Sequence, residues 1–328
     1  MSWGAAALLG GILLGGCSLL ADLDSLGNGG DGTGGGTGVS NGPSGGETDP
    51  GGTGAGGGAS TGGGGAAGPG EPSLCPAGPG PTMVRVEANP NPYCIDSTEV
   101  TIAQYLEFVD ASALDESILD EQGPGCSKGD NESLIPEGGL ASWWNKMVRA
   151  DANDESQMDH PVRFVDWCDA TAYCKWAGKR LCGARAGGPV AVVDDRIDSP
   201  KDAQWFHACT RGGSQPYPYG ARPSPANVPS GICRDGDSSP TNENSLRNRT
   251  APVGSLAGCE GGFDGLFDMS GNAAEWIDSC ALMQDGVFRC ATAGGTYSFM
   301  ADACFCEFVE WHEPKFVYNT VGFRCCSP

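Results

Sequence analysis

The sequence contains no lysine or arginine before Arg85, and histidine occurs only three times in the chain. Over all 328 residues, 41 acidic side chains outnumber 19 basic ones, which gives a net charge of −22. Recognition of nucleic acid relies on basic side chains, so this charge excludes a nucleic-acid partner. The same charge disfavours peripheral contact with anionic lipids.

Several motifs of metal sites and enzymes are also missing. A Cys-x-x-Cys pair and a cluster of histidines are both absent, which excludes a zinc site of the usual spacing. His160, His207 and His312 are scattered and offer no ligand set for iron. The sequence has no serine-nucleophile motif, P-loop or dinucleotide-binding fingerprint.

The apolar stretch near the N-terminus, Ala5 to Leu14, is too short to span a bilayer and fits the hydrophobic region of a signal peptide. Gly15, Gly16 and Cys17 follow it, and a lipoprotein signal peptidase requires small residues before a cysteine. We therefore expect residues 1–17 to be a lipoprotein signal peptide with a lipidated Cys17. The missing basic residues depart from this pattern. An ordinary signal peptide, or a buried helix with a chance cysteine, is the alternative.

Lipidation of Cys17 would make a lipid bilayer the first partner of the protein. An anchor of the diacylglyceryl type carries more than one acyl chain, as stable membrane residence requires. We expect an exported, membrane-anchored lipoprotein at the bacterial outer membrane or cell surface.

Glycine dominates the next segment, with 23 of the 46 residues from Gly27 to Pro72. No apolar periodicity is present there to offset the entropy of ordering the chain. We predict a disordered linker over residues 18–74, with a root-mean-square span of about 40 Å. Residues 75–328 follow without another low-complexity break and are expected to form one globular domain.

Sixteen cysteines indicate an oxidising compartment, because disulfides persist there. Without Cys17 fifteen remain, so at least one thiol must stay outside intramolecular disulfides. Cys280 and Cys290 are close enough in sequence for a local bridge, as are Cys233 and Cys259. The sequence alone does not pair Cys75, Cys94, Cys126, Cys168, Cys182, Cys304 and Cys326.

Three short helices are predicted. The first begins at Thr101, which forms a capping box with Gln104, and its apolar face has helical spacing: Ile102, Tyr105, Leu106 and Val109. The second runs from about Trp167 to Ala177, between Asp166 as N-cap and Gly178 as the stop. The third begins with Ser199 as N-cap and Pro200 as the first helical residue, and ends near Cys209. A strand pattern follows near Ala291 to Phe299.

Four segments in order along residues 83–326 resemble motifs of one family. They are Tyr93-Cys-Ile-Asp-Ser-Thr-Glu-Val-Thr101 with Tyr105 and Phe108; His160-Pro-Val to Ala177-Gly-Lys-Arg-Leu181; Gly265-Leu-Phe-Asp-Met-Ser-Gly-Asn-Ala-Ala-Glu-Trp276; and Gly294-Gly-Thr-Tyr297 with Gly322-Phe-Arg-Cys325. Together they resemble the formylglycine-generating-enzyme (sulfatase-modifying factor) family. The resemblance implies a compact α+β domain that is related to C-type lectins, has little regular secondary structure and is rich in disulfides.

The resemblance also implies two long-range disulfides, Cys174–Cys325 and Cys209–Cys306. Each closes a loop of roughly 100 residues or more. For loops of this length the chain-entropy model predicts that a disulfide stabilises the folded state by more than about 4 kcal/mol. One insertion, Cys182 to Asp198, departs from the family pattern and has no assigned role.

Members of the family that oxidise a cysteine to formylglycine bind copper through two cysteines, five positions apart, after the Gly-Gly-Ser-Tyr stretch. Two soft thiolates suit Cu(I). Here the first position is Phe299 and the second is Cys304, so the pair is broken. Cys306 is a shifted alternative, but alternate residues of a strand point to opposite faces. We therefore do not expect copper.

Two further changes alter the same site. Ala274 replaces the first tryptophan of the family's Gly-Asn-x-Trp-Glu-Trp motif, which removes an aromatic wall of the cleft. Thr296 replaces a serine and keeps the hydroxyl group.

The segment Asp268 to Glu275 resembles a calcium loop of the family. The carboxylates of Asp268 and Glu275, with carbonyl oxygens of Gly271 and Ala273, would suit this hard cation. A surface turn with two acids is the alternative. Asn227 resembles the start of a second calcium site, but no carboxylate follows at the expected spacing.

His160 lies in the His-Pro-Val turn of the family, where we expect a structural role. Trp143, Trp144 and Trp311 are candidate stacking platforms for a sugar or peptide, although buried aromatic residues are commoner. The broken copper pair favours a non-catalytic binding or structural module with an unknown protein or carbohydrate ligand. A copper-dependent oxidase that uses Cys304 and Cys306, or another activity in the same cleft, is the alternative.

Overall fold

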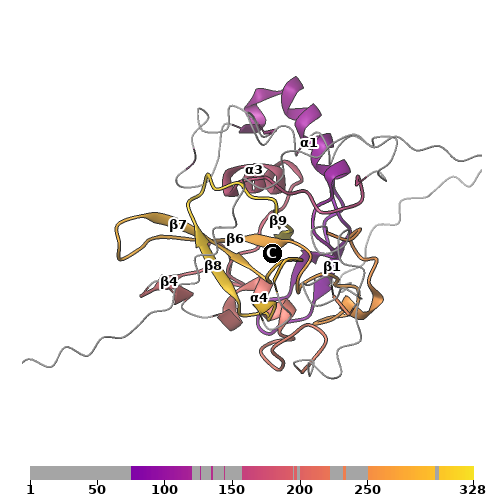
Figure 1. The fold of residues 1–328 in the computed structure, drawn as a ribbon, viewed down its shortest axis with the longest axis vertical. Helices are drawn as coiled ribbons and strands as arrows, with labels where there is room; N and C mark the ends of the chain where they lie inside the picture. Colours follow the sequence, from indigo (N-terminus) through magenta and orange to yellow (C-terminus); the bar gives the residue numbers. More distant parts are fainter. Residues whose placement is uncertain are drawn as a thin grey trace, which may run out of the picture. The chain divides into compact units, whose positions relative to one another are not determined.

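The computed structural model describes residues 75–119, 126, 134–135, 144, 157–194, 196–197, 200–221, 232–233, 250–299 and 303–328. Cys17, the glycine-rich linker, Trp143 and Asn227 lie outside these ranges. The described part combines short helices and short strands with long irregular connections, which confirms the expected α+β class (Figure 1). In the described ranges, no helix is both long and apolar enough to cross a membrane.

Helix α1 spans Ile102–Leu114 and begins as the sequence predicts. The Thr101 hydroxyl accepts a hydrogen bond from the Gln104 N–H, and the Gln104 side chain accepts one from the Thr101 N–H. These two bonds satisfy donors that a helix start leaves open. The fully buried face contains Ile102, Tyr105 and Phe108.

Helix α3 spans Trp167–Trp176 and also has a capping box, in which Asp166 and Asp169 each accept a backbone N–H of the other. It ends where predicted, because Gly178 adopts a φ of 71°, a conformation that favours glycine.

The third predicted helix is interrupted. Pro200–Asp202 form a 3-10 turn (η2), Ala203 is extended with φ −88° and ψ 137°, and helix α4 spans only Gln204–Cys209. The predicted N-cap, Ser199, lies outside the described residues.

The insertion after Leu181 explains this interruption. Ala184 forms a β-bridge with Ala203, and the Gln204 N–H donates to the Gly183 carbonyl oxygen at 2.8 Å. These backbone groups are therefore engaged with the insertion instead of with a continuous helix. The insertion also contains a two-stranded hairpin, β4 (Val192–Val193) and β5 (Arg196–Ile197), and begins at the Cys182–Cys326 disulfide.

One antiparallel sheet has the order β1-β2-β10-β3. Its strands are β1 (Met83–Val86), β2 (Tyr93–Asp96), β10 (Cys325–Ser327) and β3 (Arg180–Leu181). The last strand of the chain, β10, thus lies between the earlier strands β2 and β3 and is paired on both edges.

The second sheet has the order β8-β7-β6-β9. Strands β6 (Ala274–Leu282), β7 (Phe288–Ala293) and β8 (Val309–His312) are antiparallel neighbours, and β9 (Val321–Phe323) is parallel to β6. The strand predicted from Ala291 to Phe299 is wrong at both ends. It ends at Ala293 because Gly294 and Gly295 adopt φ values of 93° and 72°.

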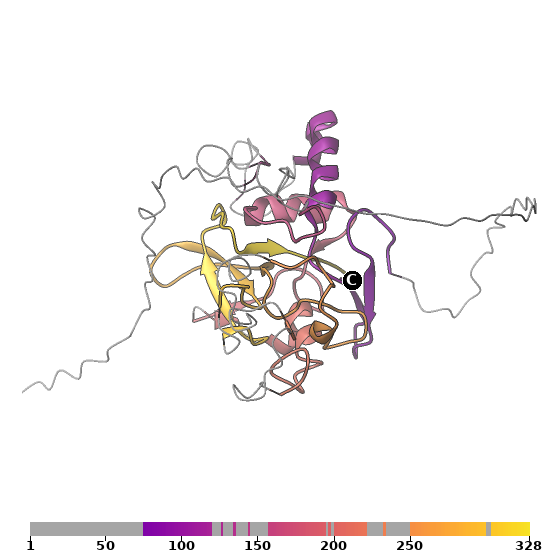
Figure 2. The ribbon, with the colours of Figure 1, turned by 45° about the vertical axis from the view of Figure 1, so that its right-hand side comes forward.

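Both faces of the second sheet contribute side chains to the core. Helices α1 and α3 lie on one side of it and α4 lies on the other, in both views of the ribbon (Figures 1 and 2). Alternate residues therefore enter two different cores. Trp276 and Cys290 pack with α1 and α3, whereas Ile277 and Ala291 pack with α4.

Seven disulfides join the described cysteines. The four expected pairs have S–S distances from 1.90 to 2.10 Å: Cys174–Cys325, Cys209–Cys306, Cys233–Cys259 and Cys280–Cys290. The sequence left the other three open: Cys75–Cys94, Cys126–Cys168 and Cys182–Cys326. Of the cysteines in the described ranges, Cys304 is the one outside these bridges.

Candidate functional site

The loop after β7 forms the centre of the expected copper site. Gly294 and Gly295 turn the chain sharply, and the Thr296 hydroxyl lies 2.7 Å from that of Ser298. A Cβ atom on Gly295 would lie 2.8 Å from the Sγ atom of Cys304. Glycine is therefore required here, both by its backbone angles and by the close approach of Cys304.

Cys304 is a buried thiol that the surrounding backbone holds in place. Its side chain is directed at the carbonyl oxygens of Thr296, at 3.6 Å, and Phe299, at 3.9 Å. The Ser270 hydroxyl donates to the Cys304 carbonyl oxygen at 2.6 Å. Only 1% of Cys304 is exposed, so the thiol does not face solvent.

The donors around Cys304 do not fit a two-thiolate copper site. Cys306 is bonded to Cys209, so its sulfur is not a thiolate. Phe299 occupies the first family position and packs against the Phe308 ring, with centroids 5.6 Å apart. Within the described ranges, Cys304 alone offers a thiol at this place. A single buried thiol gives Cu(I) half of the required ligand pair.

Ala274 opens strand β6 and is 2% exposed, within the core that contains α1 and α3. Its methyl group contributes no aromatic surface to a cleft.

The expected calcium loop is instead part of a buried ion-pair network. Arg324 donates from Nε to Oε2 of Glu275 and from Nη2 to Oε1, both at 2.7 Å. The Trp205 indole also donates to Oε2 at 2.7 Å. Both carboxylate oxygens of Glu275 are thus engaged, and the positive charge beside them belongs to Arg324.

Asp268, the other predicted carboxylate ligand, accepts the Gly254 N–H at 2.6 Å. The backbone at Gly271 and Ala273 is held through its N–H groups, which donate to the Gly294 carbonyl oxygen and to Glu99. In the described part of the chain, no group of three His, Cys, Asp or Glu side chains is arranged to hold a metal. The calcium site at Asp268, Gly271, Ala273 and Glu275 stays a prediction, and in this structure Arg324 and Trp205 occupy the Glu275 carboxylate. The second one, at Asn227, lies outside the described residues.

Sequence reasoning missed a third acid in this network. Glu99 is fully buried, and its Oε2 atom has no hydrogen-bond partner among the described residues. Burial and the nearby Asp268 carboxylate raise the pKa of Glu99 well above its usual value. Burial also raises the pKa of Asp268 to about 6. Glu99 and Asp268 therefore keep their protons at a higher pH than solvent-exposed acids do.

A second buried ion pair was also missed. Lys179 donates to Asp96 at 2.6 Å, and both side chains are fully buried. The other oxygen of Asp96 accepts the Cys325 N–H at 2.9 Å. The Lys179-Arg-Leu181 segment was noted in the sequence, but nothing in its pattern pointed to Asp96.

The three histidines lie in different surroundings. The Nδ1 atom of His160 lies 3.0 Å from the Thr250 hydroxyl, and its carbonyl oxygen accepts the Ile102 N–H at the start of α1. These are the contacts of a structural residue. His207 lies 3.0 Å from the Tyr93 hydroxyl, and His312 stacks on Phe316 with centroids 4.2 Å apart.

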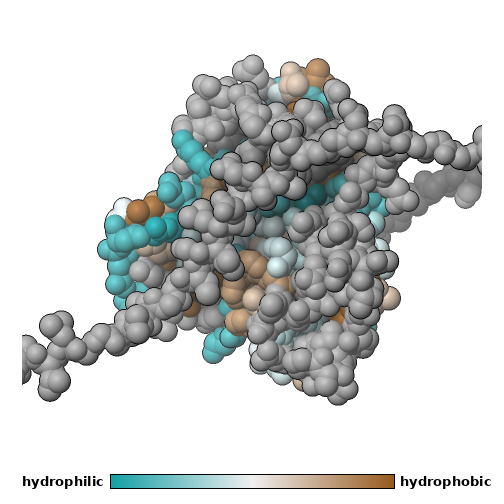
Figure 3. All heavy atoms as spheres, in the orientation of Figure 1, coloured by the Kyte–Doolittle hydropathy of each residue, from teal (hydrophilic) through white to brown (hydrophobic). Residues whose placement is uncertain are grey.

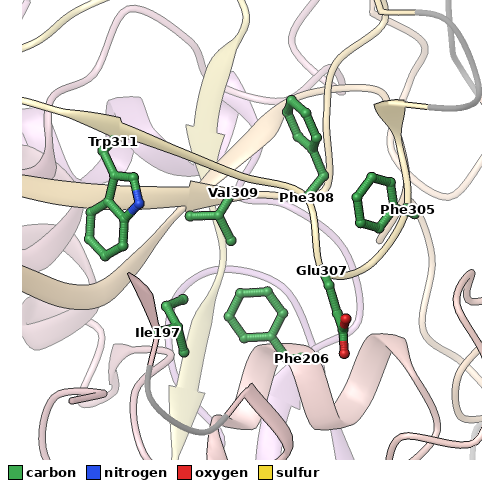
Figure 4. Close-up of a pocket in the computed structure, with 7 residues that line it drawn as sticks. All are labelled: Ile197, Phe206, Phe305, Glu307, Phe308, Val309 and Trp311. Carbon is green, nitrogen blue, oxygen red and sulfur yellow. The ribbon is translucent and has the colours of Figure 1, made fainter. Parts of the chain in front are cut away.

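The two described tryptophans among the predicted stacking platforms differ in their exposure. Trp144 is buried against Tyr105, with ring centroids 6.0 Å apart, so it cannot stack on a ligand. Trp311 lines an open pocket beside helix α4 (Figure 4).

This fold and its altered site define a domain of the sulfatase-modifying factor class. Residues 57–327 match the family described as "Sulfatase-modifying factor enzyme 1-like domain", and the chain belongs to that family.

Two curated relatives of this chain carry names that differ in activity. The bovine (Bos taurus) protein named "Formylglycine-generating enzyme" is 27% identical over 274 residues, which cover 72% of this chain and 65% of that protein. The mouse (Mus musculus) protein named "Inactive C-alpha-formylglycine-generating enzyme 2" is 28% identical over 278 residues, which cover 76% and 79%. The match spans less than two thirds of the bovine enzyme and 51% of its mouse counterpart.

Among solved structures, PvdO from Pseudomonas aeruginosa is 16% identical to this chain, with a TM-score of 0.45. The match covers 72% of this chain and 80% of PvdO. CarF is 21% identical with a TM-score of 0.44, and the match covers 72% and 86% of the two chains.

Proposed function

We propose that this formylglycine-generating-enzyme-like domain is a non-catalytic binding module. The observation that carries the proposal is the state of the two sulfurs after β7: Cys304 is a buried thiol, whereas Cys306 is bonded to Cys209. The chemistry attributed to the active family members requires two thiolates on one copper ion. A relative whose name calls it inactive supports the idea that the fold serves other purposes.

The seven disulfides and two buried ion pairs support a role as a rigid platform. Rigid binding sites lose less conformational entropy when a ligand binds. Cysteine usage of this kind also fits a protein exported to an oxidising compartment.

Anchoring through Cys17 is the second part of the proposal. Lipid on Cys17 would hold the domain at a membrane, and the linker of residues 18–74 would let it search the space above. A Cys17→Ser variant should be exported but should lose lipid labelling and membrane fractionation. Continued lipid labelling of this variant would refute the anchoring site.

One observation favours a residual oxidase as the second candidate: Cys304 remains a thiol and lies beside the Gly294–Thr296 turn. The test is to incubate the purified domain with copper, a reductant, oxygen and a sulfatase-type peptide that contains cysteine. Mass spectrometry should find the peptide cysteine unchanged. Copper-dependent formylglycine on that peptide, lost in Cys304→Ser, would replace the binding module by the oxidase.

A further inference from the structure

A pocket of about 550 Å³ opens beside helix α4, and no part of the altered copper site or the ion-pair network lines it. Its size falls within the range of sites for small molecules. Its described lining comes from β5, α4, the segment before β8 and β8 itself: Ile197, Phe206, Phe305, Glu307, Phe308, Val309 and Trp311. Apolar atoms gather at the surface over the region of β8 and α4 (Figure 3).

The Cys209–Cys306 disulfide fixes two walls of this pocket relative to each other. Phe206 lies in α4 three residues before Cys209, and Phe305 and Glu307 flank Cys306. Phe206 is 1% exposed and forms part of the core. The walls are therefore held in place before any ligand arrives, which favours binding.

The third wall belongs to the sheet. Val309 and Trp311 are alternate residues of β8, so their side chains lie on the same face. Their backbones are in register with Ala293 and Ala291 of β7. Figure 4 shows both side chains on the pocket side of the strand, above Ile197 and Phe206.

One charged group accompanies these apolar walls. Glu307 is the only ionisable side chain on the described lining, and it is exposed to solvent (Figure 4). Four aromatic side chains line the same pocket: Phe206, Phe305, Phe308 and Trp311. Aromatic faces and a carboxylate both attract positive charge. The net charge of −22 attracts cations to the protein as well.

The few polar side chains on the described lining limit which cations the pocket can bind. A primary ammonium has three N–H donors and a guanidinium has five, and each donor without an acceptor is costly to bury. A sugar carries several hydroxyl groups with the same requirement. The described lining offers only the Glu307 carboxylate and the Trp311 indole N–H as polar side-chain groups. A methylated ammonium group has few or no N–H donors and presents methyl groups to the aromatic walls.

We propose that this pocket binds the methylated ammonium group of a small organic cation, with Glu307 providing the negative charge and the aromatic residues providing the walls. The inference names the ligand class of the binding module and so rests on the proposed function.

Choline tests the proposal together with its neutral isostere, 3,3-dimethylbutan-1-ol. A calorimetric titration of the folded domain should detect choline binding with a dissociation constant below about 10 mM. The neutral alcohol should bind at least about tenfold more weakly, because it has the same shape without the charge. Equal binding of the two compounds would overturn the proposal, as would no choline binding to the folded domain.

Two matched variants locate the site. Glu307→Gln keeps the size of the side chain and should weaken choline binding at least about threefold, in line with a solvent-accessible charge pair. Glu313→Gln, at an exposed acid outside the described lining, should change binding less than about twofold. Equal losses in both variants would show nonspecific attraction to an acidic protein and would refute the pocket.

A Phe305→Leu variant separates the aromatic contribution from apolar burial. It should weaken choline more than it weakens the neutral alcohol, because leucine keeps apolar contact but has no aromatic face. An equal effect on both ligands would refute the role of the aromatic walls. These titrations do not depend on the peptide-oxidation test. If the domain oxidises no peptide and binds no choline, this inference is refuted and the proposed non-catalytic function is not.

Discussion

Arg324 and Glu275 face each other inside the domain through two hydrogen bonds of 2.7 Å, and the two side chains are no more than 1% exposed. Arg324 also donates to the backbone oxygens of Asp96 and Phe267, which belong to two other motifs of the family. Burial tends to lower the pKa of Arg324, but Glu275 and its neighbouring acids raise it overall, so the guanidinium remains charged. One side chain thus joins the β2, β6 and β9–β10 regions of the chain.

This pairing leads to a prediction about stability. Arg324→Met should lower the free energy of unfolding by about 3–5 kcal/mol, because Glu275 would be left as a buried charge without its partner. Urea unfolding measures the loss. The exposed pair Arg289–Asp285 provides a control, and Arg289→Met should cost less than about 1 kcal/mol. Similar losses in the two variants would contradict the network.

The same pairing leads to a prediction about calcium. Because Arg324 already neutralises Glu275, a chelator should leave the thermal unfolding of the domain unchanged. A ligand that binds only the folded state would raise the melting temperature in proportion to its concentration. A scan with and without EGTA, followed by addition of excess calcium, makes this comparison. A lower melting temperature in EGTA that calcium restores would show a metal site outside the geometry described for Glu275.

The buried acids should make stability depend on pH. The pKa of Asp268 is raised from an ordinary 3.8 to about 6, so the folded state holds its proton more tightly than the unfolded state. Stability is therefore greatest below about pH 4 for this group and falls as the pH rises to about 6 and beyond. Asp268→Asn should reduce this fall by about 1–3 kcal/mol, because asparagine can still accept the Gly254 N–H.

Asp285 provides a control, because its pKa is shifted in the opposite direction to that of Asp268. Hydrogen bonds from Val287 and Arg289 lower the pKa of this exposed acid. Asp285→Asn should therefore leave the fall in stability between pH 4 and 6 in place or make it steeper. A wild-type domain whose unfolding free energy rises over this range, with Asp268→Asn showing no difference, would contradict the buried protons.

The cysteines allow a direct chemical count. A Cys17→Ser variant made in an oxidising compartment should contain one thiol, at Cys304, because the other described cysteines form seven disulfides. Maleimide should label it after denaturation without reductant, but not in the folded state, since only 1% of Cys304 is exposed. Peptide mapping identifies the labelled residue. Label on Cys174, Cys209 or Cys306 would show that the pairing is different.

Local signals in the sequence were sufficient for much of the fold. Thr101 with Gln104, and Asp166 with Gly178, predicted the ends of two helices because capping depends on residues that are close in sequence. The third helix was mispredicted because Gln204 and Ala203 bond to the inserted segment near Gly183. A contact of that kind has no local signature.

The same distinction applies to the candidate site. Phe299 and Ala274 could be identified as departures because each lies within a short motif. The partner of Glu275 could not, since Arg324 is 49 residues away and both residues had other plausible roles. The pocket beside α4 was also missed, because its lining residues, such as Phe206, Phe305 and Trp311, are far apart in the sequence.

The central claim is that Cys304 cannot hold Cu(I) as one of two thiolates, and copper titration tests it most directly. The folded domain should be titrated with Cu(I) in competition with a chromogenic chelator, beside a Cys304→Ser variant. We predict that neither protein retains a stoichiometric copper ion, because Cys306 is bonded to Cys209 and Phe299 provides no sulfur. One equivalent of tightly bound Cu(I) in the wild type, lost in Cys304→Ser, would contradict the non-catalytic account.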